Sequence, residues 1–166
     1  MKLHIANFYD APRHTAVAGE DIALGAVIKI SANAAGERKA LTVGDSDSAE
    51  LVDGKWGVAA KVSVDQLQVS ESLFGVPTEW GSRVVAIKSG DAIVQVAKGA
   101  IIEYDPSLLH TSLNPAEAGG ALPVVGEALA IKGGKFCKAN VSGAITSPVV
   151  GRVFDVLGGK VRIELV

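Results

Sequence analysis

Short apolar runs separated by glycine-rich turns occur along most of the chain. At the C-terminal end, residues 160–166 alternate between apolar and polar side chains. A period of two residues is typical of a strand with one buried face. Residues 149–157 form another apolar run, and Gly158-Gly159 between the two runs can adopt the positive φ angles of a tight turn. The pattern therefore predicts a β-hairpin at this end of the chain.

Three further pairs of runs have the same construction. Asp-Gly and Gly-Gly are among the strongest short-range signals for a hairpin turn. Four hairpins predict an all-β fold, a small β-barrel or a sandwich of short antiparallel hairpins, with at most one or two short helices. The three further pairs are residues 127–131 and 135–141 around Gly133-Gly134, residues 83–87 and 92–96 around Ser89-Gly90-Asp91, and residues 49–52 and 55–62 around Asp53-Gly54.

The two halves of the chain resemble each other in the order of their runs. Each series begins with glycine, passes through a turn to a second run, and ends in a run that contains Gly-Val or Gly-Arg-Val. Such self-similarity is a sign of duplication, but antiparallel β proteins also share it by chance. The first series covers residues 25–30, 39–43 and 56–62, and the second covers residues 126–131, 135–141 and 150–156.

Composition excludes several classes of protein. Of the 166 residues, 48% are hydrophobic and 20% are charged, which is too apolar for a disordered chain and suits one domain. The 16 basic and 18 acidic residues nearly balance, so we expect no nucleic-acid or membrane partner. No apolar run approaches the roughly 20 residues that cross a bilayer. The N-terminus lacks the apolar core of a signal peptide, so we expect synthesis in the cytoplasm.

Residues that commonly carry enzyme chemistry are few and scattered. The three histidines, His4, His14 and His110, lack the spacing of a metal site. A hydrolase on this scaffold would need His110 together with a carboxylate such as Asp105. Cys137 lies in a predicted strand, where a free cysteine usually packs as a small apolar side chain. We therefore expect no enzyme activity, no metal and no cofactor.

Two other features have structural rather than functional interpretations. Residues 44–48, Gly-Asp-Ser-Asp-Ser, superficially resemble a calcium loop but lack the glycine and glutamate of an EF-hand, so a solvated loop is predicted. Trp56 and Trp80 are the two indoles, and each is expected to pack rather than to stack on a ligand.

Three segments lack the hairpin pattern. Residues 64–81 are predicted to form a loop or a short helix that ends near Gly75, and residues 104–120 a loop in which residues 106–109 could open one helical turn. Loops of this length in compact domains are usually functional or mobile. Residues 1–18 have no turn-bounded partner run. We therefore divide the chain into an extended N-terminal arm, residues 1–18, and a β-rich domain, residues 19–166. The apolar side chains of the first half of the arm are Leu3, Ile5, Phe8 and Tyr9.

The extended N-terminus and the runs at residues 18–30, 56–59 and 126–166 resemble the capsid decoration, or cement, proteins of tailed bacteriophages. The resemblance leaves the two long loops unaccounted for. It implies a structural protein that binds the outer surface of an assembled phage head as a homotrimer, commonly at or near three-fold positions, and stabilises it. The implied partners are the major capsid protein and further copies of the chain, and the implied location is the outside of the virion capsid.

An arm of this length suits such a role. Eighteen extended residues span up to about 60 Å, enough to reach a neighbouring subunit and add a strand to its sheet. We expect Leu3, Ile5, Phe8 and Tyr9 to anchor the arm on the major capsid protein. The alternative function is a carbohydrate- or receptor-binding β module on a virion or cell surface, which would use Trp80 and residues 104–120.

Overall fold

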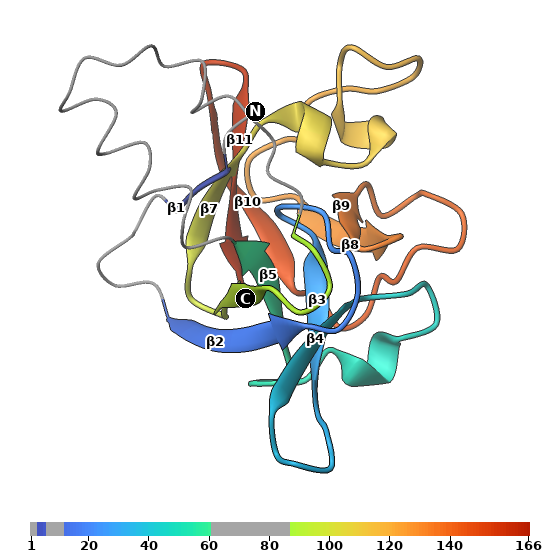
Figure 1. Cartoon of the computed structure of the whole chain (residues 1–166). Coiled ribbons are helices and arrows are strands. Elements are labelled where there is room, and N and C mark those ends of the chain that lie inside the picture. Colours follow the sequence, from blue (N-terminus) through green and yellow to red (C-terminus); the bar gives the residue numbers. More distant parts are fainter. Residues whose placement is uncertain (1–2, 6–11, 61–86) are drawn as a thin grey trace, which may run out of the picture.

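The fold is all-β, as the sequence predicts. The computed structural model describes residues 3–5, 12–60 and 87–166. Their strands form a closed barrel of five strands and an open sheet of six (Figure 1). The helical segments within these ranges are 3-10 turns of three residues each, η1 (Ser48–Glu50), η3 (Pro106–Leu108) and η4 (Thr111–Leu113).

Apart from β1, the strands of the barrel precede those of the open sheet in the chain. The barrel contains, in order around it, β2 (Arg13–Ala18), β4 (Arg38–Thr42), β3 (Val27–Ala32), β5 (Trp56–Ala60) and β6 (Ala92–Val96). The open sheet contains, in order across it, β1 (Leu3–Ile5), β7 (Ile101–Tyr104), β11 (Lys160–Leu165), β10 (Gly151–Leu157), β8 (Ala128–Lys132) and β9 (Lys135–Cys137).

Two five-stranded units of the same topology make up this fold. We call β2 to β6 the N-terminal unit and β7 to β11 the C-terminal unit. The order across the N-terminal unit is β4-β3-β5-β6-β2, and the order across the C-terminal unit is β9-β8-β10-β11-β7. Each strand of the first order therefore corresponds to the strand five places later in the chain. The repeat in the sequence is thus a repeat of strand order.

Backbone hydrogen bonds repeat at the same positions in both units. Each unit contains one series of runs, and a glycine precedes the first strand of that series. The N–H of this glycine donates to the carbonyl of a residue in the third strand of the series. The N–H of that third-strand residue donates in turn to the carbonyl of the residue after the glycine. Because both bonds recur, the correspondence holds residue by residue. The bonds are Gly25 N–H to Ala59 (2.9 Å) with Ala59 N–H to Ala26 (2.9 Å), and Gly126 N–H to Val153 (2.8 Å) with Val153 N–H to Glu127 (2.9 Å).

A glycine at the same place in β5 and β10 makes room for a side chain inside each unit. A Cβ atom on Gly57 would lie 2.5 Å from Cγ of Gln95, and one on Gly151 would lie 2.5 Å from Cε1 of Phe136. Neither glycine could become alanine without moving a buried neighbour. The Gly-Val and Gly-Arg-Val patterns of the sequence therefore reflect packing.

The two units differ in how they close. In the N-terminal unit, β2 pairs in parallel with β4 and completes the barrel. In the C-terminal unit, β7 pairs instead with β1 and β11. The segment after β7 lies against β9, because the N–H of His110 donates to the carbonyl of Phe136 at 3.0 Å. The C-terminal unit is thus a half-barrel, flanked by a strand from outside the unit and by the η3–η4 segment.

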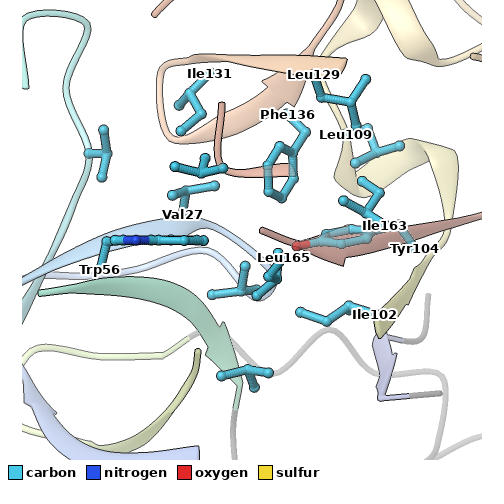
Figure 2. Close-up of a cluster of buried hydrophobic side chains, with 14 of the residues drawn as sticks. Val27, Trp56, Ile102, Tyr104, Leu109, Leu129, Ile131, Phe136, Ile163 and Leu165 are labelled. Atoms are coloured by element: carbon cyan, nitrogen blue, oxygen red, sulfur yellow. The ribbon is translucent and has the colours of Figure 1, made fainter. Parts of the chain in front are cut away.

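The apolar face of the N-terminal unit fills this half-barrel. Inside the barrel, a small core consists of alanine and isoleucine side chains. On the outside, Val27 and Trp56 point into a larger core that they share with Tyr104 and Phe136 of the C-terminal unit (Figure 2). Val58 belongs to the same core. Trp56 is 2% exposed, which confirms its predicted packing role. Since both units contribute to one core, they are held together as one body.

Two of the predicted hairpins form as expected. Gly133-Gly134 joins β8 to β9, and Gly158-Gly159 joins β10 to β11, with positive φ at all four glycines. The strand predicted over residues 135–141 is shorter, because β9 ends at Cys137 and a turn follows it. Of the hairpin predicted over residues 83–96, residues 83–86 lie outside the described residues, as do residues 64–81 of the first long loop.

The hairpin predicted around Asp53-Gly54 is wrong. Ser48–Glu50 form the 3-10 turn η1, and β5 pairs with β3 and β6 rather than with residues 49–52. The reason is local turn chemistry before this segment, since the Asp47 carboxylate accepts the N–H of Gly44 at 2.8 Å. Aspartate side chains that bond nearby backbone in this way compete with strand formation.

The division at residue 18 also needs correction. Arg13–Ala18 form β2, whose alanines 16 and 18 are buried in the barrel, and Leu3–Ile5 form β1 on the edge of β7. Local sequence gave no partner for these runs because their partners, β4, β6 and β7, are distant in the chain. These described parts of the predicted arm therefore belong to the folded body.

Candidate interaction surface

The predicted arm anchors occupy different situations. Leu3 and Ile5 belong to β1, opposite Tyr104 and Ile102 of β7. The side chain of Leu3 is half-buried and packs against the larger core. Phe8 and Tyr9 lie outside the described residues. Leu3 thus stabilises its own chain, and contact between any of the four side chains and another protein stays a prediction.

Tyr104 joins the two units through a buried hydrogen bond. Its hydroxyl donates to the carbonyl of Gly25 at 3.0 Å, and its ring meets that of Phe136 edge to face, with centroids 5.9 Å apart. Burial raises the pKa of Tyr104, so the hydroxyl remains a donor at all ordinary pH values. This bond gives a donor to the carbonyl of Gly25, which has a positive φ in the turn before β3.

Residues 44–48, the loop that superficially resembles a calcium loop, connect the two units through Asp45. The carboxylate of Asp45 accepts the N–H of Gly133 at 2.8 Å and pairs with Nζ of Lys132 at 2.6 Å. The hydrogen bond from Lys132 holds the pKa of Asp45 below its usual value. Asp47 pairs in the same loop with Lys29 at 2.8 Å. Both carboxylates therefore bind lysines of the chain itself.

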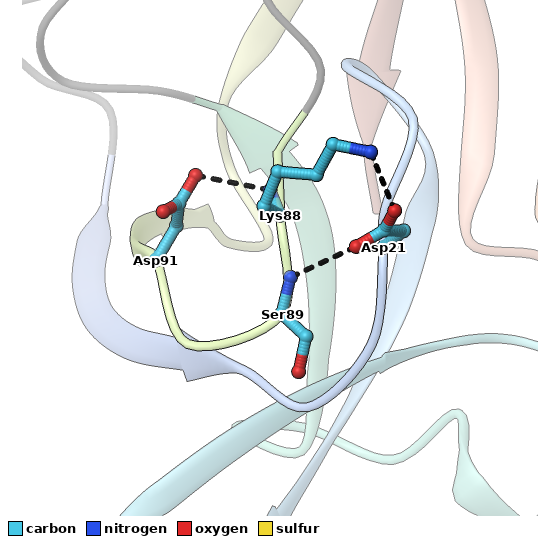
Figure 3. Close-up of polar contacts among 4 residues, drawn as sticks. All are labelled: Asp21, Lys88, Ser89 and Asp91. Carbon is cyan, nitrogen blue, oxygen red and sulfur yellow. Dashed lines mark hydrogen bonds and ion pairs between the residues drawn. The ribbon is translucent and has the colours of Figure 1, made fainter.

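A second polar cluster ties the start of the N-terminal unit to the turn before β6. Asp21 pairs with Nζ of Lys88 at 2.6 Å and accepts the N–H of Ser89 at 3.0 Å, while Asp91 accepts the N–H of Lys88 at 3.0 Å (Figure 3). The hydrogen bond from Lys88 lowers the pKa of Asp21. Two of these three contacts hold backbone N–H groups in place, which gives this cluster a structural role.

Asp105 and His110, the residues considered for a hydrolase, serve as caps of separate 3-10 turns. Asp105 accepts from Ser107 of η3 and pairs with Nζ of Lys160 at 2.6 Å, and the pKa of its carboxyl is lowered to about 2, chiefly by Lys160. Nδ1 of His110 accepts the N–H of Ser112 at 3.1 Å. Oδ1 of Asp105 and Nδ1 of His110 thus each accept an N–H from the backbone of their own turn.

Cys137 is fully buried at the end of β9. Burial raises the pKa of its thiol to about 11, which leaves very little thiolate near neutral pH. This agrees with the predicted packing role. Across the described ranges, no group of three or more His, Cys, Asp or Glu residues is arranged to hold a metal ion.

Exposed apolar side chains gather along one strand. Among the described residues, six large apolar side chains are exposed, and five of them lie on β10 or beside it. The turn that carries two of the five is attached to β10 by the bond from Gly126 to Val153. We call these five residues the β10 strip. They are Val124, Val125, Val149, Phe154 and Leu157.

The largest member of the strip, Phe154, lies at a β-bulge. The pairing of β10 with β11 shifts between Val153 and Asp155, so Phe154 is the extra residue without a partner. Bulges commonly redirect a side chain out of the regular alternation. Phe154 is 48% exposed, whereas Val153 is buried in the shared core. The sequence contained a sign of this, because Phe154 falls two residues after exposed Arg152 in a strand that alternates.

Charged side chains surround Phe154 on the outer face of the half-barrel. Arg162 of β11 pairs with Glu103 at 2.9 Å and with Asp155 at 3.3 Å, bridging three neighbouring strands. These ion pairs are partly buried but lie at the surface, where such pairs contribute little stability. Their effect is to fix charged groups of both signs next to an exposed aromatic ring.

Comparison with known proteins gives no further identification. No protein-family model matches the sequence, and no curated protein matches it significantly. Within the ranges that the structure covers, no helix has the length and apolar character needed to span a membrane.

Proposed function

We propose that this protein is a capsid decoration protein, which binds the outer surface of an assembled phage head as a homotrimer and stabilises it. The sequence resemblance to cement proteins is the origin of the proposal. The observation that carries it is the β10 strip, a set of exposed apolar side chains on and beside one strand. Clustered exposed apolar groups mark contact with other proteins.

The way the two units are joined also supports a role in stiffening a shell. A shared core, the Tyr104 bond to Gly25 and the Asp45 contacts all resist separation of the units. Closely packed interiors have low compressibility and transmit strain. A decoration protein that stiffens a shell against internal pressure needs such a body. The major capsid protein is the proposed partner, and the outside of the virion is the proposed location.

The candidates for chemistry have structural partners instead. Asp105, His110 and Asp45 each bind backbone or lysine groups that fix turns. The alternative of a carbohydrate- or receptor-binding module depended on Trp80, outside the described residues, and on residues 104–120. The η3 and η4 turns of that loop are held by Asp105 and His110. We therefore propose a structural protein rather than an enzyme.

Deletion of residues 2–15 would be a poor test of binding, because it removes β1 and half of β2. Point variants are better. Heads of the parent phage, prepared without this chain, are mixed with purified protein and sedimented. We expect the wild type to sediment with the heads to a saturating ratio, and the double variant Phe8→Ser, Tyr9→Ser to bind much less.

The matched control is Val52→Ser, which removes an exposed apolar side chain away from the arm and the β10 strip. It is expected to bind like the wild type. If the wild type fails to sediment with heads, the decoration function is wrong. If the double variant binds as tightly as the wild type, the arm anchors are wrong while the function stands.

A further inference from the structure

We propose that the outer face of the C-terminal unit, centred on the β10 strip, is the surface through which copies of this chain associate. For the number of copies, the proposal rests on the homotrimer of the proposed function. For the position of the surface, it rests on the equivalence of the two units. The occupant is a second copy of the chain.

The first argument compares equivalent positions in the two units. Since Ala59 corresponds to Val153, Val58 and Ala60 of β5 correspond to Arg152 and Phe154 of β10. In the N-terminal unit this face is covered by the C-terminal unit, and Val58 is completely buried. In the C-terminal unit the same face is open. One chain therefore covers this face of one of its units and leaves the other uncovered.

The turns before the first strand of each series show the same contrast. Ala26 donates to Ala23 at 3.1 Å, and Glu127 donates to Val124 at 3.0 Å, so the two turns are equivalent. The N-terminal turn has Ala23, which is exposed, and Leu24, which is half-buried, at the two corresponding positions. The C-terminal turn has Val124 and Val125, which are 73% and 61% exposed. Exposing two branched apolar side chains at a turn tip is unfavourable in water and becomes favourable when a partner covers them.

The charges of this face favour a copy of the same face over a highly charged partner. Three basic and three acidic side chains alternate across β7, β10 and β11, so the face has no net charge but carries groups of both signs. In a trimer this face of each copy meets the same face of two others around a three-fold axis, and a face with groups of both signs can pair its charges across those contacts. A nucleic acid or a uniformly charged protein would meet as many repulsive as attractive groups. The six residues are Arg152, Lys160, Arg162, Glu103, Asp155 and Glu164.

The surface also has the composition of a protein contact. An aromatic residue with apolar neighbours and a charged rim is the usual arrangement of an interface centre. The bulge at Phe154 leaves the ring free of the regular pairing of β10 with β11. A charge placed at Phe154 would have to be desolvated in the contact, which strongly disfavours association.

The oligomeric state of the protein in solution tests this proposal directly. Full-length wild type, Phe154→Asp and the control Val52→Asp are compared by sedimentation velocity and light scattering over a range of concentrations. We expect a trimeric mass for the wild type and for Val52→Asp, and a monomeric mass, one third as large, for Phe154→Asp. Circular dichroism and a thermal melt check that each variant is folded.

A second variant guards against misfolding at the bulge. Val124→Asp with Val125→Asp changes an exposed turn, and it is also expected to give a monomer. If both strip variants keep the wild-type mass, the surface is wrong. If the wild type is a monomer at every concentration, self-association is wrong, and the head-binding experiment still decides the decoration function. A wild-type trimer that does not bind heads, together with monomeric strip variants, would instead support the surface and contradict the decoration function.

Discussion

Replacing Gly134 with alanine probes the contact between the two units. Gly134 has a φ of 71° in the turn between β8 and β9, and its carbonyl accepts the N–H of Val27 at 2.7 Å. A Cβ atom there would lie 2.2 Å from Cγ2 of Thr42 in the N-terminal unit. Gly159 occupies the same place in the turn between β10 and β11, with a φ of 75° and nothing within 4 Å of a Cβ.

The two glycines therefore separate backbone strain from a clash between units. Either alanine must adopt a left-handed conformation, which costs roughly 1–2 kcal/mol. Gly134→Ala must in addition displace Thr42 and disturb the bond to Val27, and overpacking of this kind costs about 1–3 kcal/mol more. At this chain length, each kcal/mol lowers the melting temperature by about 2–4 °C.

Urea unfolding of both variants measures the difference. We expect Gly159→Ala to lower the free energy of unfolding modestly, and Gly134→Ala to lower it further by the cost of the clash. Adding Thr42→Ser, which removes Cγ2, should recover that further loss in the Gly134→Ala background and not in the Gly159→Ala background. Equal losses for the two alanine variants, without recovery, would refute the contact between this turn and β4.

Three other predictions concern single side chains. Tyr104→Phe leaves the Gly25 carbonyl without its donor and should cost about 1–3 kcal/mol in the free energy of unfolding, measured in urea; no loss would contradict a buried bond. Asp105 has its pKa lowered to about 2 from 3.8, so its contribution to stability is present above about pH 4 and is lost as the pH falls towards 2. Asp105→Asn should flatten melting temperature against pH in that window, and an unchanged profile would argue against the pair with Lys160. Cys137, buried and with a thiol pKa of about 11, should react with a thiol reagent only after unfolding, and rapid labelling of the native protein would contradict its burial.

Local pattern was a good guide to two hairpins whose strands are close in the chain. The glycine pairs at 133–134 and 158–159 form the expected hairpins because positive φ and flanking apolar runs act together within a few residues. The two series of runs correspond to two units of the same strand order. Trp56 and Cys137 pack as their residue types and positions predicted.

Pairings between distant segments were not visible in the pattern. The parallel pairing of β2 with β4 and the addition of β1 to β7 leave no signature in the sequence around residues 1–18. Apolar residues in a segment without a local partner were therefore attributed to a free arm. The η1 turn was missed for a different reason, because the Asp47 bond to Gly44 outweighed the alternation that followed it.

The β10 strip was partly readable. Alternation places Phe154 on the same face as Arg152, and an aromatic residue on a polar face is a sign of an exposed contact. The participation of Val124 and Val125 depends on the turn lying beside β10, which only the three-dimensional structure shows. Alternation could therefore have indicated Phe154, which no expectation from the sequence included, and the structure supplied the other members of the strip.

The decoration role is tested most directly by electron cryomicroscopy of heads prepared without this chain, before and after purified protein is added. We expect new density on the outer surface only, in three-lobed units near the three-fold positions, large enough in each lobe for one small barrel joined to a half-barrel. Heads with no added density at saturating protein, or with density only inside the shell, would contradict a decoration function.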